Sequence, residues 1–434
     1  QASRNQNPES RMIELKPVPI EHAILIALVT EDYSKDQVEE HLEELELLTN
    51  TAGAITVFKI MQERYRPDPA YFIGKGKAEE VAQLIELNDI QLVIFDDDLN
   101  STQARNLEKL FERKVLDRSG LIFDIFASHA KTREAKTQVE LAQLQYMLPR
   151  LTRAWTHLSK QYGGIGTKGP GETQIETDRR IIRTKISKLK ENLKKITAQQ
   201  VTKSAGRKDQ ITACLVGYTN AGKSTLLNRL TDAGVLAEDK LFATLDSTTR
   251  SFEIEKNKKI LMSDTVGFIR KLPHHLVASF KSTLNVVKDA DLILHVIDIS
   301  HDFFEDHINV VDSTLEELNS HKKTQIKIFN KVDALKDKNR MDYVVKQYKN
   351  SILISAERGI NIGNLKKMLL NIYEQNFVTG KVELKHHESK LVSKLYELAE
   401  IISADYEEEK IIITYRANKS VNDKIQRMVR EKSI

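Results

Sequence analysis

The chain has 434 residues, too many for one hydrophobic core, so two to four domains are expected. Its composition, 40% hydrophobic and 29% charged residues, is typical of soluble globular proteins, and no apolar run is long enough to span a membrane. The only cysteine, Cys214, excludes an intramolecular disulfide and a cysteine-based zinc site, which favours a cytoplasmic location. Residues 1–22 are polar at their start and are expected to form a disordered tail or a tag.

The next segment alternates between strand-like and helix-like stretches. Strands are expected at 24–29, 54–61, 92–95 and from 115 onward, with helices at 35–48, 77–87 and 101–113. Ser101 is expected to cap the last helix, and Asp96, Asp97 and Asp98 to form a solvated strand end rather than a cation site. Because strands alternate with helices, residues 23–130 are predicted to form an α/β domain with a parallel sheet covered on both faces.

Residues 131–208 combine positive charge with a helical period. They hold 18 Lys or Arg against 6 Asp or Glu, so this segment carries +12 in a chain whose net charge is +4, and the remainder carries about −8. The charge favours a polyanionic partner such as RNA or DNA, although a solvated, lysine-rich helical hairpin explains it equally well. Apolar residues recur every three or four positions along two seams: Leu141, Leu144, Leu148, Leu151, Trp155 and Leu158, then Ile182, Ile186, Leu189, Leu193 and Ile196. The seams predict an antiparallel helical hairpin whose first helix is kinked or broken at Pro149.

The loop between the two seams is rich in glycine. Five of the chain's 17 glycines lie within nine positions: Gly163, Gly164, Gly166, Gly169 and Gly171. Glycine allows close backbone approaches that other residues cannot make, and a simple turn would need fewer residues. A functional tip is therefore preferred over the alternative, a flexible turn between helices.

A second α/β pattern occupies residues 209–375. Its expected strands lie at 211–216, 260–262, 292–297, 326–329 and 352–354. The last segment, 376–434, is predicted to be a small α+β domain, and its residues suggest no chemistry. Within it a helix is expected over 389–403, a strand over 410–415 and a helix from 420.

A phosphate-binding loop is predicted directly after the first strand of this second pattern. The run Gly217, Tyr218, Thr219, Asn220, Ala221, Gly222, Lys223, Ser224 fits Gly-x4-Gly-Lys-Ser, and Thr225 begins the following helix. Backbone amides and the helix N-terminus attract phosphates. Lys223 is expected to reach the β- and γ-phosphates, and the Ser224 hydroxyl to bind Mg²⁺.

Three further motifs follow predicted strands in the order expected of a guanine-nucleotide domain. They are Asp264, Thr265, Val266, Gly267; then Asn330, Lys331, Val332, Asp333; then Ser355, Ala356, Glu357. Asp264 is expected to hold Mg²⁺ through water and the Gly267 amide to sense the γ-phosphate. Asp333 can accept hydrogen bonds from guanine N1–H and its exocyclic amine, which adenine lacks, and a backbone amide near Ala356 can meet O6. The four motifs predict a GTPase domain that hydrolyses GTP.

The segment 242–250 lies where the first switch of a GTPase is expected. Phe242, Ala243, Thr244, Leu245 and Asp246 are its candidate nucleotide contacts. Thr244 is the preferred second hydroxyl ligand of Mg²⁺, with Thr248 and Thr249 as alternatives. Lys223, Thr244 and Gly267 are the candidate catalytic residues.

Taken together, the switch, the loop with the following 176–180, and the stretch 73–77 resemble the HflX family of bacterial GTPases, in the Obg–HflX superfamily. The resemblance covers about 23–373. Ser247 stands in place of the switch's usual proline, and Glu357 in place of a frequent basic residue.

The resemblance implies binding to the large ribosomal subunit and to 23S rRNA, and the splitting of stalled ribosomes, notably in heat stress. The RNA contacts are expected from the glycine-rich tip and the basic hairpin: Gly163, Gly164, Gly166, Lys168, Gly169, Gly171, Arg179 and Arg180. Off the ribosome the protein is expected to be monomeric. Two alternatives remain: an antibiotic-resistance factor that protects the peptidyl-transferase centre, and an ATP-dependent RNA remodeller that uses the first domain.

Phe268 stands where many GTPases place a glutamine that orients the attacking water. A phenyl ring cannot polarise water, so slow hydrolysis is expected of the protein alone. Asn220 lies where some GTPases use asparagine to help hold a catalytic K⁺, so K⁺ is a second possible cofactor.

Overall fold

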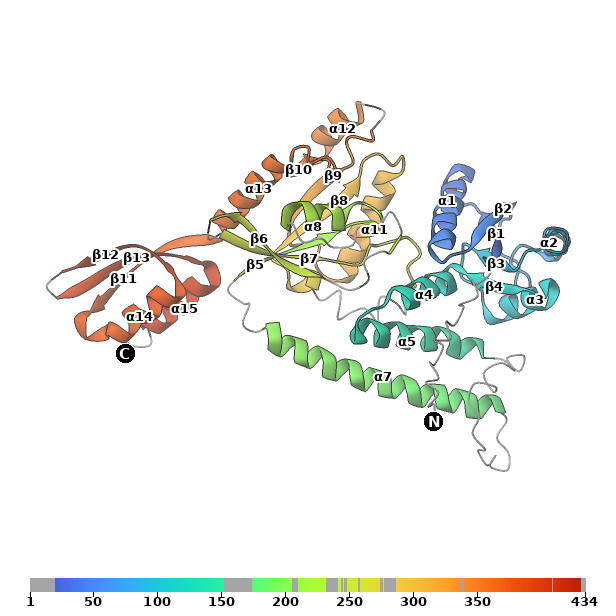
Figure 1. Cartoon of the computed structure of the whole chain (residues 1–434), viewed down its shortest axis with the longest axis horizontal. Helices are drawn as coiled ribbons and strands as arrows, with labels where there is room; N and C mark the ends of the chain where they lie inside the picture. Colours follow the sequence, from blue (N-terminus) through green and yellow to red (C-terminus); the bar gives the residue numbers. More distant parts are fainter. Residues whose placement is uncertain are drawn as a thin grey trace, which may run out of the picture. The chain divides into compact units, whose positions relative to one another are not determined.

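The computed structural model describes residues 20–151, 174–204, 210–231, 241–242, 245, 248–256, 258–273, 276, 286–335, 337, 339–407 and 409–430. The chain divides into two units, Gln1–Ile122 and Phe123–Ile434, whose helices and strands are labelled in Figure 1. Within the described residues, no helix is long and apolar enough to cross a bilayer.

The first unit is built on a four-stranded parallel sheet in the order β2-β1-β3-β4. Its elements are β1 His22–Val29, α1 Lys35–Thr51, β2 Ile55–Glu63, α2 Lys75–Leu87, β3 Leu92–Phe95, α3 Ser101–Phe111 and β4 Lys114–Asp117. The predicted α/β fold is confirmed, with each strand and helix close to its expected place. The two central strands β1 and β3 are almost wholly buried, as expected for a parallel sheet covered by helices.

Two helices of this unit begin with a reciprocal capping box. Ser34 and Gln37 cap α1, and Asn100 and Gln103 cap α3 by exchanging side-chain and backbone hydrogen bonds. The predicted cap, Ser101, is therefore wrong by one residue. Asn100 accepts the amide hydrogen bonds, and Ser101 is the first helical residue.

A buried ion network closes the carboxyl end of β3. Asp96 is 1% exposed and accepts a hydrogen bond of 2.7 Å from the guanidinium of Arg118, which also contacts the Glu44 carboxylate. The prediction of a solvated strand end was thus wrong for Asp96. The Asp96 charge is compensated within this network. Removing Asp96 or Arg118 would therefore leave an uncompensated charge in the interior.

The second unit begins with the basic hairpin. Its described elements are α5 Arg133–Met147, a 3-10 turn Leu148–Arg150 and α7 Gln174–Ser204; the preceding α4, Arg118–His129, spans the division between the units. As predicted, the first helix is broken near Pro149: α5 ends at Met147, and Pro149 lies in the 3-10 turn that follows.

The seam residues of the hairpin pack together as expected. Leu141, Leu151, Ile182, Ile186 and Leu189 form one buried cluster. Two contacts show that the segments run antiparallel. Lys185 pairs with Glu140 at 2.6 Å, and Arg179, earlier along α7, donates to the backbone oxygen of Leu151, later along the first segment. Trp155 and Leu158 lie outside the described residues.

A six-stranded sheet in the order β10-β9-β8-β5-β7-β6 forms the centre of this unit. Its elements are β5 Ile211–Val216, α8 Lys223–Thr231, β6 Thr249–Glu255, β7 Lys258–Asp264, β8 Leu292–Asp298, α11 Phe304–Glu317, β9 Thr324–Asn330, α12 Asn339–Gln347, β10 Ser351–Leu353 and α13 Ile362–Gln375. All five predicted strands are present. The additional edge strand β6 pairs antiparallel with β7, while the other pairs are parallel.

The chain ends in an antiparallel sheet in the order β11-β13-β12, with two helices. The elements are β11 Phe377–Lys385, α14 Ser389–Leu398, β12 Glu400–Tyr406, β13 Lys410–Asn418 and α15 Lys419–Arg430. The helix predicted to extend to residue 403 ends at Leu398, because the following residues form β12 by pairing with β13.

Candidate nucleotide site

The predicted phosphate loop connects the end of β5 with the start of α8, at the carboxyl edge of the central sheet. Gly217 and Gly222 both have positive φ angles, +154° and +91°. A Cβ on Gly217 would collide with the backbone oxygen of Val296 in β8, and one on Gly222 with the side-chain amide of Asn330. Glycine is required at these positions because the loop lies directly against its neighbours.

Lys223 is buried inside this loop. Its side-chain ammonium donates hydrogen bonds to the backbone oxygens of Gly217, at 3.1 Å, and of Tyr218, at 2.7 Å. Burial lowers the pKa of Lys223 to about 8, against an opposing effect from Asp264. The buried position therefore destabilises the charged form of Lys223 in the protein alone. Anionic phosphates beside it would stabilise that charged form.

Two oxygen ligands suited to Mg²⁺ lie together beside the loop. The Ser224 hydroxyl donates a hydrogen bond of 2.6 Å to Asp264, whose other carboxylate oxygen accepts from the Thr265 amide at 2.9 Å. Asp264 is fully buried, and burial raises its pKa against the effect of Lys223. A buried carboxylate beside a hydroxyl is the hard oxygen set that Mg²⁺ prefers, so Ser224 and Asp264 fit the expected ion.

The motif that begins at Asp264 runs alongside the phosphate loop. The Thr219 amide donates to the Phe268 oxygen at 2.8 Å, and the Phe268 amide to the Gly217 oxygen at 3.1 Å. A Cβ on Gly267 would lie 2.8 Å from the Thr219 Cα, so only glycine allows this approach. The Phe268 side chain is buried in a hydrophobic cluster with Cys214 and other apolar residues. It therefore has no polar group to offer an attacking water.

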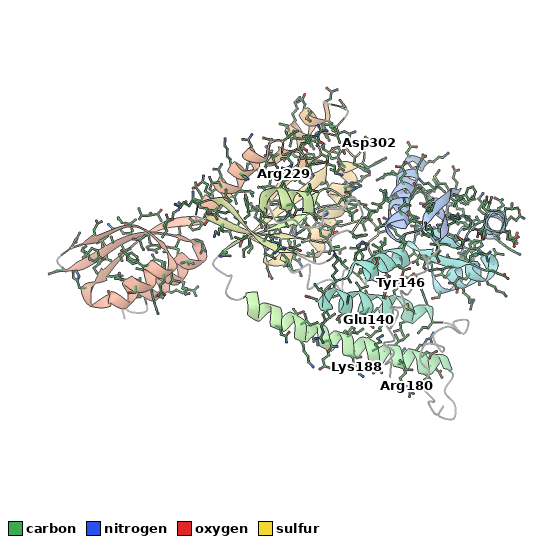
Figure 2. The ribbon with its side chains drawn as sticks, in the orientation of Figure 1. Glu140, Tyr146, Arg180, Lys188, Arg229 and Asp302 are labelled. Atoms are coloured by element: carbon green, nitrogen blue, oxygen red, sulfur yellow. The ribbon has the colours of Figure 1, made fainter. Side chains whose placement is uncertain are left out.

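Asn330 joins the phosphate loop to the last nucleotide motif. Its buried side chain donates to the Ala221 oxygen and accepts from the Ala356 amide, each at 2.9 Å. Arg229 of α8 (Figure 2) holds the same motif from another side, with a hydrogen bond of 3.0 Å to the Ala356 oxygen and a contact with the Glu357 oxygen. The three segments are thus held together around the position predicted for guanine.

Asp333 lies at the edge of this assembly with its side chain 14% exposed. A hydrogen bond from Ser355 is the main cause that lowers the pKa of Asp333, and the nearby Arg358 guanidinium also lowers it. The neighbouring Lys331 pairs with Asp298 at 2.7 Å. The carboxylate is therefore held ionised, as an acceptor of guanine's two donors must be.

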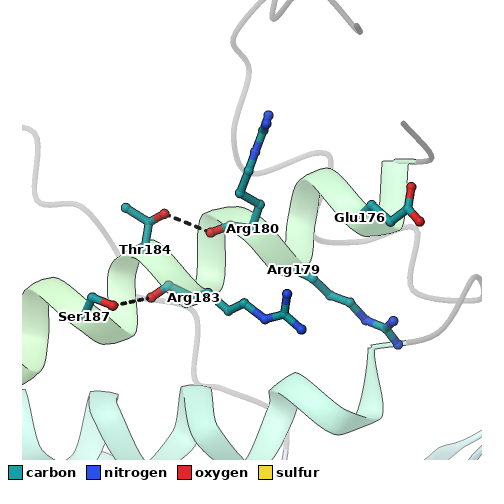
Figure 3. Close-up of a pocket in the computed structure, with 6 residues that line it drawn as sticks. All are labelled: Glu176, Arg179, Arg180, Arg183, Thr184 and Ser187. Carbon is teal, nitrogen blue, oxygen red and sulfur yellow. Dashed lines mark hydrogen bonds between the residues drawn. The ribbon is translucent and has the colours of Figure 1, made fainter. Parts of the chain in front are cut away.

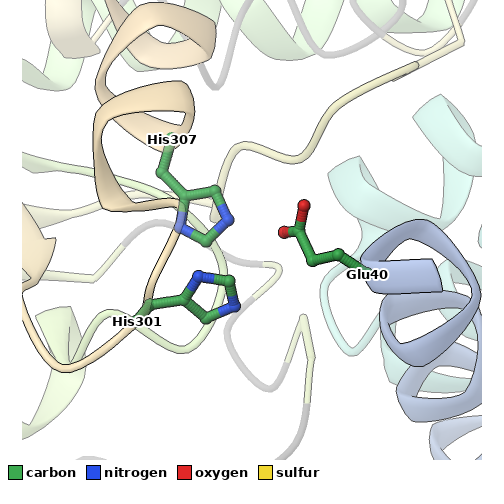
Figure 4. A group of neighbouring side chains, drawn as sticks. All are labelled: Glu40, His301 and His307. Carbon is green, nitrogen blue, oxygen red and sulfur yellow. The ribbon is translucent and has the colours of Figure 1, made fainter. Parts of the chain in front are cut away.

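Sequence reasoning missed the aromatic contact of the phosphate loop. The Tyr218 ring stacks on His307 of α11 with centroids 3.7 Å apart, and its hydroxyl accepts from the Arg270 amide at 3.1 Å. Figure 4 shows His307 beside His301, with ring centroids 4.4 Å apart. Glu40, drawn with them, belongs to α1 of the other unit. Tyr218 thus connects the loop to the segment after Phe268 and to α11.

The predicted first switch is described only in part. Ala243, Thr244 and Asp246 lie outside the described residues, so the proposed second hydroxyl ligand has no place in this geometry. Phe242 and Leu245 are buried, and the Phe242 ring lies edge-on to Phe126 with centroids 4.6 Å apart. A nucleotide contact from these two residues would therefore come from the backbone.

The RNA-binding residues predicted in the glycine-rich tip, Gly163 to Gly171 with Lys168, lie outside the described residues. Arg179 and Arg180, by contrast, lie on α7 with Arg183 (Figure 3). With Glu176, Thr184 and Ser187 they line a pocket. Both hydroxyls donate back to the helix, to the oxygens of Arg180 and Arg183, and the Arg179 guanidinium also donates to the Leu151 oxygen at 3.0 Å.

Replacing Asn330 by alanine should destabilise the second unit. The change would leave the Ala221 oxygen and the Ala356 amide without their partner, at a cost of about 2–4 kcal/mol, or roughly 5–15 °C in melting temperature. Differential scanning calorimetry of the Asn330→Ala and Asn364→Ala proteins measures this. Asn364 is exposed on α13, so its variant should melt like the parent. Equal melting temperatures for both variants would contradict the linking role.

Three family models match the chain in succession. They are described as GTP-binding GTPase N-terminal over residues 39–127, GTP-binding GTPase Middle Region over 129–207, and 50S ribosome-binding GTPase over 212–331. A protein from Flavobacterium psychrophilum named GTPase HflX is 45% identical over 389 residues, which cover 85% of this chain and 94% of that protein. GTPase HflX of Escherichia coli is 42% identical over 392 residues, or 90% of this chain and 91% of that protein. A solved GTP-binding protein from Sulfolobus solfataricus in complex with GDP has a TM-score of 0.44 and 24% identity, over 82% of this chain and 99% of that one.

Proposed function

The chain belongs to the HflX family of GTPases, and from that premise we propose that it binds the large ribosomal subunit and splits or rescues stalled ribosomes in the cytoplasm. The observation that carries the ribosomal part is the group of three arginines on α7, Arg179, Arg180 and Arg183, which belong to the basic hairpin and line one pocket. Arginines in this arrangement suit the phosphates of 23S rRNA, which they would bind without reading base sequence.

GTP hydrolysis by this family member would use the site around the phosphate loop. In the proposal, Lys223 binds the β- and γ-phosphates, and the Gly267 amide contacts the γ-phosphate. Ser224 directly, Asp264 through water and Thr244 would hold Mg²⁺, which when bound would neutralise charge on the phosphates. A K⁺ ion near Asn220 also stays a prediction.

The missing water-orienting side chain suggests how the ribosome would control the reaction. Phe268 is buried and apolar, so the free protein has no polar group at that position. We expect ribosome binding to order the switches and complete the site. The nucleotide state would then control ribosome binding: the GTP form would bind tightly, and hydrolysis would lead to release.

Sucrose-gradient profiles test the proposal directly. Intact ribosomes mixed with the protein should separate into subunits with GTP or a non-hydrolysable analogue and stay intact with GDP. Hydrolysis should be much faster with large subunits than without them. Splitting that is equal with GDP and GTP, or hydrolysis as fast in the free protein as on large subunits, would contradict the proposal.

Loss of arginines from α7 should weaken ribosome binding. Arg180 and Arg183 are both exposed, and replacing both by alanine should lower affinity for large subunits and reduce the slope of log affinity against log salt by about 1–2. Pelleting assays at several salt concentrations measure both quantities. The matched control is Lys424→Ala with Arg427→Ala on α15, which removes the same charge from exposed positions. Identical losses in the two double variants would indicate a general charge effect instead of a binding surface.

A further inference from the structure

Arg358 contacts the carboxylate that would recognise guanine, although it belongs to none of the nucleotide motifs. Its side-chain Nε lies 3.1 Å from Asp333 Oδ2. Its backbone amide donates to the Ser355 hydroxyl at 3.0 Å, and Ser355 in turn hydrogen-bonds the Asp333 side chain. Asp333, Ser355 and Arg358 therefore form one connected cluster, with an ion pair between Arg358 and Asp333.

An ionised aspartate offers about four acceptor positions on its two oxygens. Ser355, the Asp333 backbone amide and Arg358 are its partners within the protein. Guanine N1–H and the exocyclic amine need two positions, so the base shares the carboxylate with these partners in one arrangement.

The orientation of the carboxylate matters most for a two-point contact. An acceptor that makes one hydrogen bond can rotate and keep it, whereas two parallel hydrogen bonds require one plane for the carboxylate. Ser355 is fully buried and holds the carboxylate from the inside. Arg358 is 69% exposed and holds it from the outer side.

We propose that Arg358 is a specificity-determining positioning residue, which fixes the plane of the Asp333 carboxylate so that both donors of guanine are read together. The inference rests on the proposed role of Asp333 in guanine recognition. It predicts that Arg358 contributes more to binding of guanine than of hypoxanthine, which keeps N1–H and lacks the exocyclic amine.

Binding of GTP and ITP to the full chain with Mg²⁺, measured by calorimetry, tests this inference. Arg358→Ala should lower the ratio of GTP affinity to ITP affinity by about two- to fivefold, the range expected for a partly exposed ion pair. The control is Arg229→Ala, which removes contacts with the Ala356 and Glu357 oxygens and no contact with Asp333. That variant should weaken GTP and ITP alike. A ratio that Arg358→Ala leaves unchanged would overturn the inference.

Two further variants separate the possible causes. Arg358→Lys keeps the charge without the guanidinium fork and should restore the ratio only in part. Full restoration by lysine would show that charge alone acts, and the positioning role would fall. The Asp333→Asn chain should exchange its preference for GTP for one for XTP. Without that exchange Asp333 does not read the base, and both assignments fail. With the exchange and an unchanged ratio in Arg358→Ala, only the role of Arg358 fails.

Discussion

Replacing Lys223 by methionine should lower the rate of GTP hydrolysis on large ribosomal subunits by roughly 100- to 1,000-fold, the cost typical of losing one donor to a developing charge. Lys223 lies within the phosphate loop and is 6% exposed. Because burial already lowers its pKa to about 8, the charged amine is costly in the protein alone. An apolar side chain of similar length should therefore leave the melting temperature unchanged or raise it. Steady-state phosphate release and a thermal melt measure the two effects.

The combination of lost activity and retained stability distinguishes a phosphate-binding lysine from a structural one. Lys346→Met, on the exposed face of α12, serves as the control and should hydrolyse GTP like the parent. A Lys223→Met protein whose rate stays within about twofold of the parent would show that the loop does not use this side chain, against the electrostatic argument.

Replacing Asp333 by asparagine should reverse the choice of nucleotide. The variant should bind GTP roughly 100-fold more weakly and gain affinity for XTP, because the amide presents an unmatched N–H to the exocyclic amine of guanine. Xanthine carries an oxygen at that position, which the amide can satisfy. Competition of labelled GTP by GTP, XTP and ATP measures the change. Asp342→Asn, an exposed position on α12, should leave the preference for GTP intact.

The same variant separates the GTPase from the ATP-dependent alternative. An ATP-hydrolysing activity of the first unit would survive Asp333→Asn, whereas activity of the site around the phosphate loop would not. In the first unit, Gly74 precedes α2 with φ +91°, and a Cβ there would collide with the Arg64 guanidinium. The positive φ at the start of α2 explains the glycine. Loss of all nucleoside triphosphatase activity with GTP and ATP would exclude the alternative.

Local patterns predicted the elements well wherever the pattern itself determines the structure. The buried parallel strands of the two α/β sheets and the Pro149 break are such cases, since apolar runs and the proline ring act within a few residues. The edge strand β6 and the strand β12 were missed. Both depend on pairing with a partner strand, and their alternation of exposed and buried positions is weak.

The features of the nucleotide site likewise divide into those that local patterns predicted and those that depend on tertiary contacts. Spacing alone located the phosphate loop and the three later motifs, because phosphate and guanine recognition need particular residues at short, regular distances. The sequence by itself therefore determined the fold class and the chemistry of a GTPase. Only the tertiary structure brought Arg229, His307 and Arg358 to these motifs and buried Asp96 with Arg118. These contacts join positions on different elements or depend on side-chain direction, and neither property is expressed in a local pattern of residues.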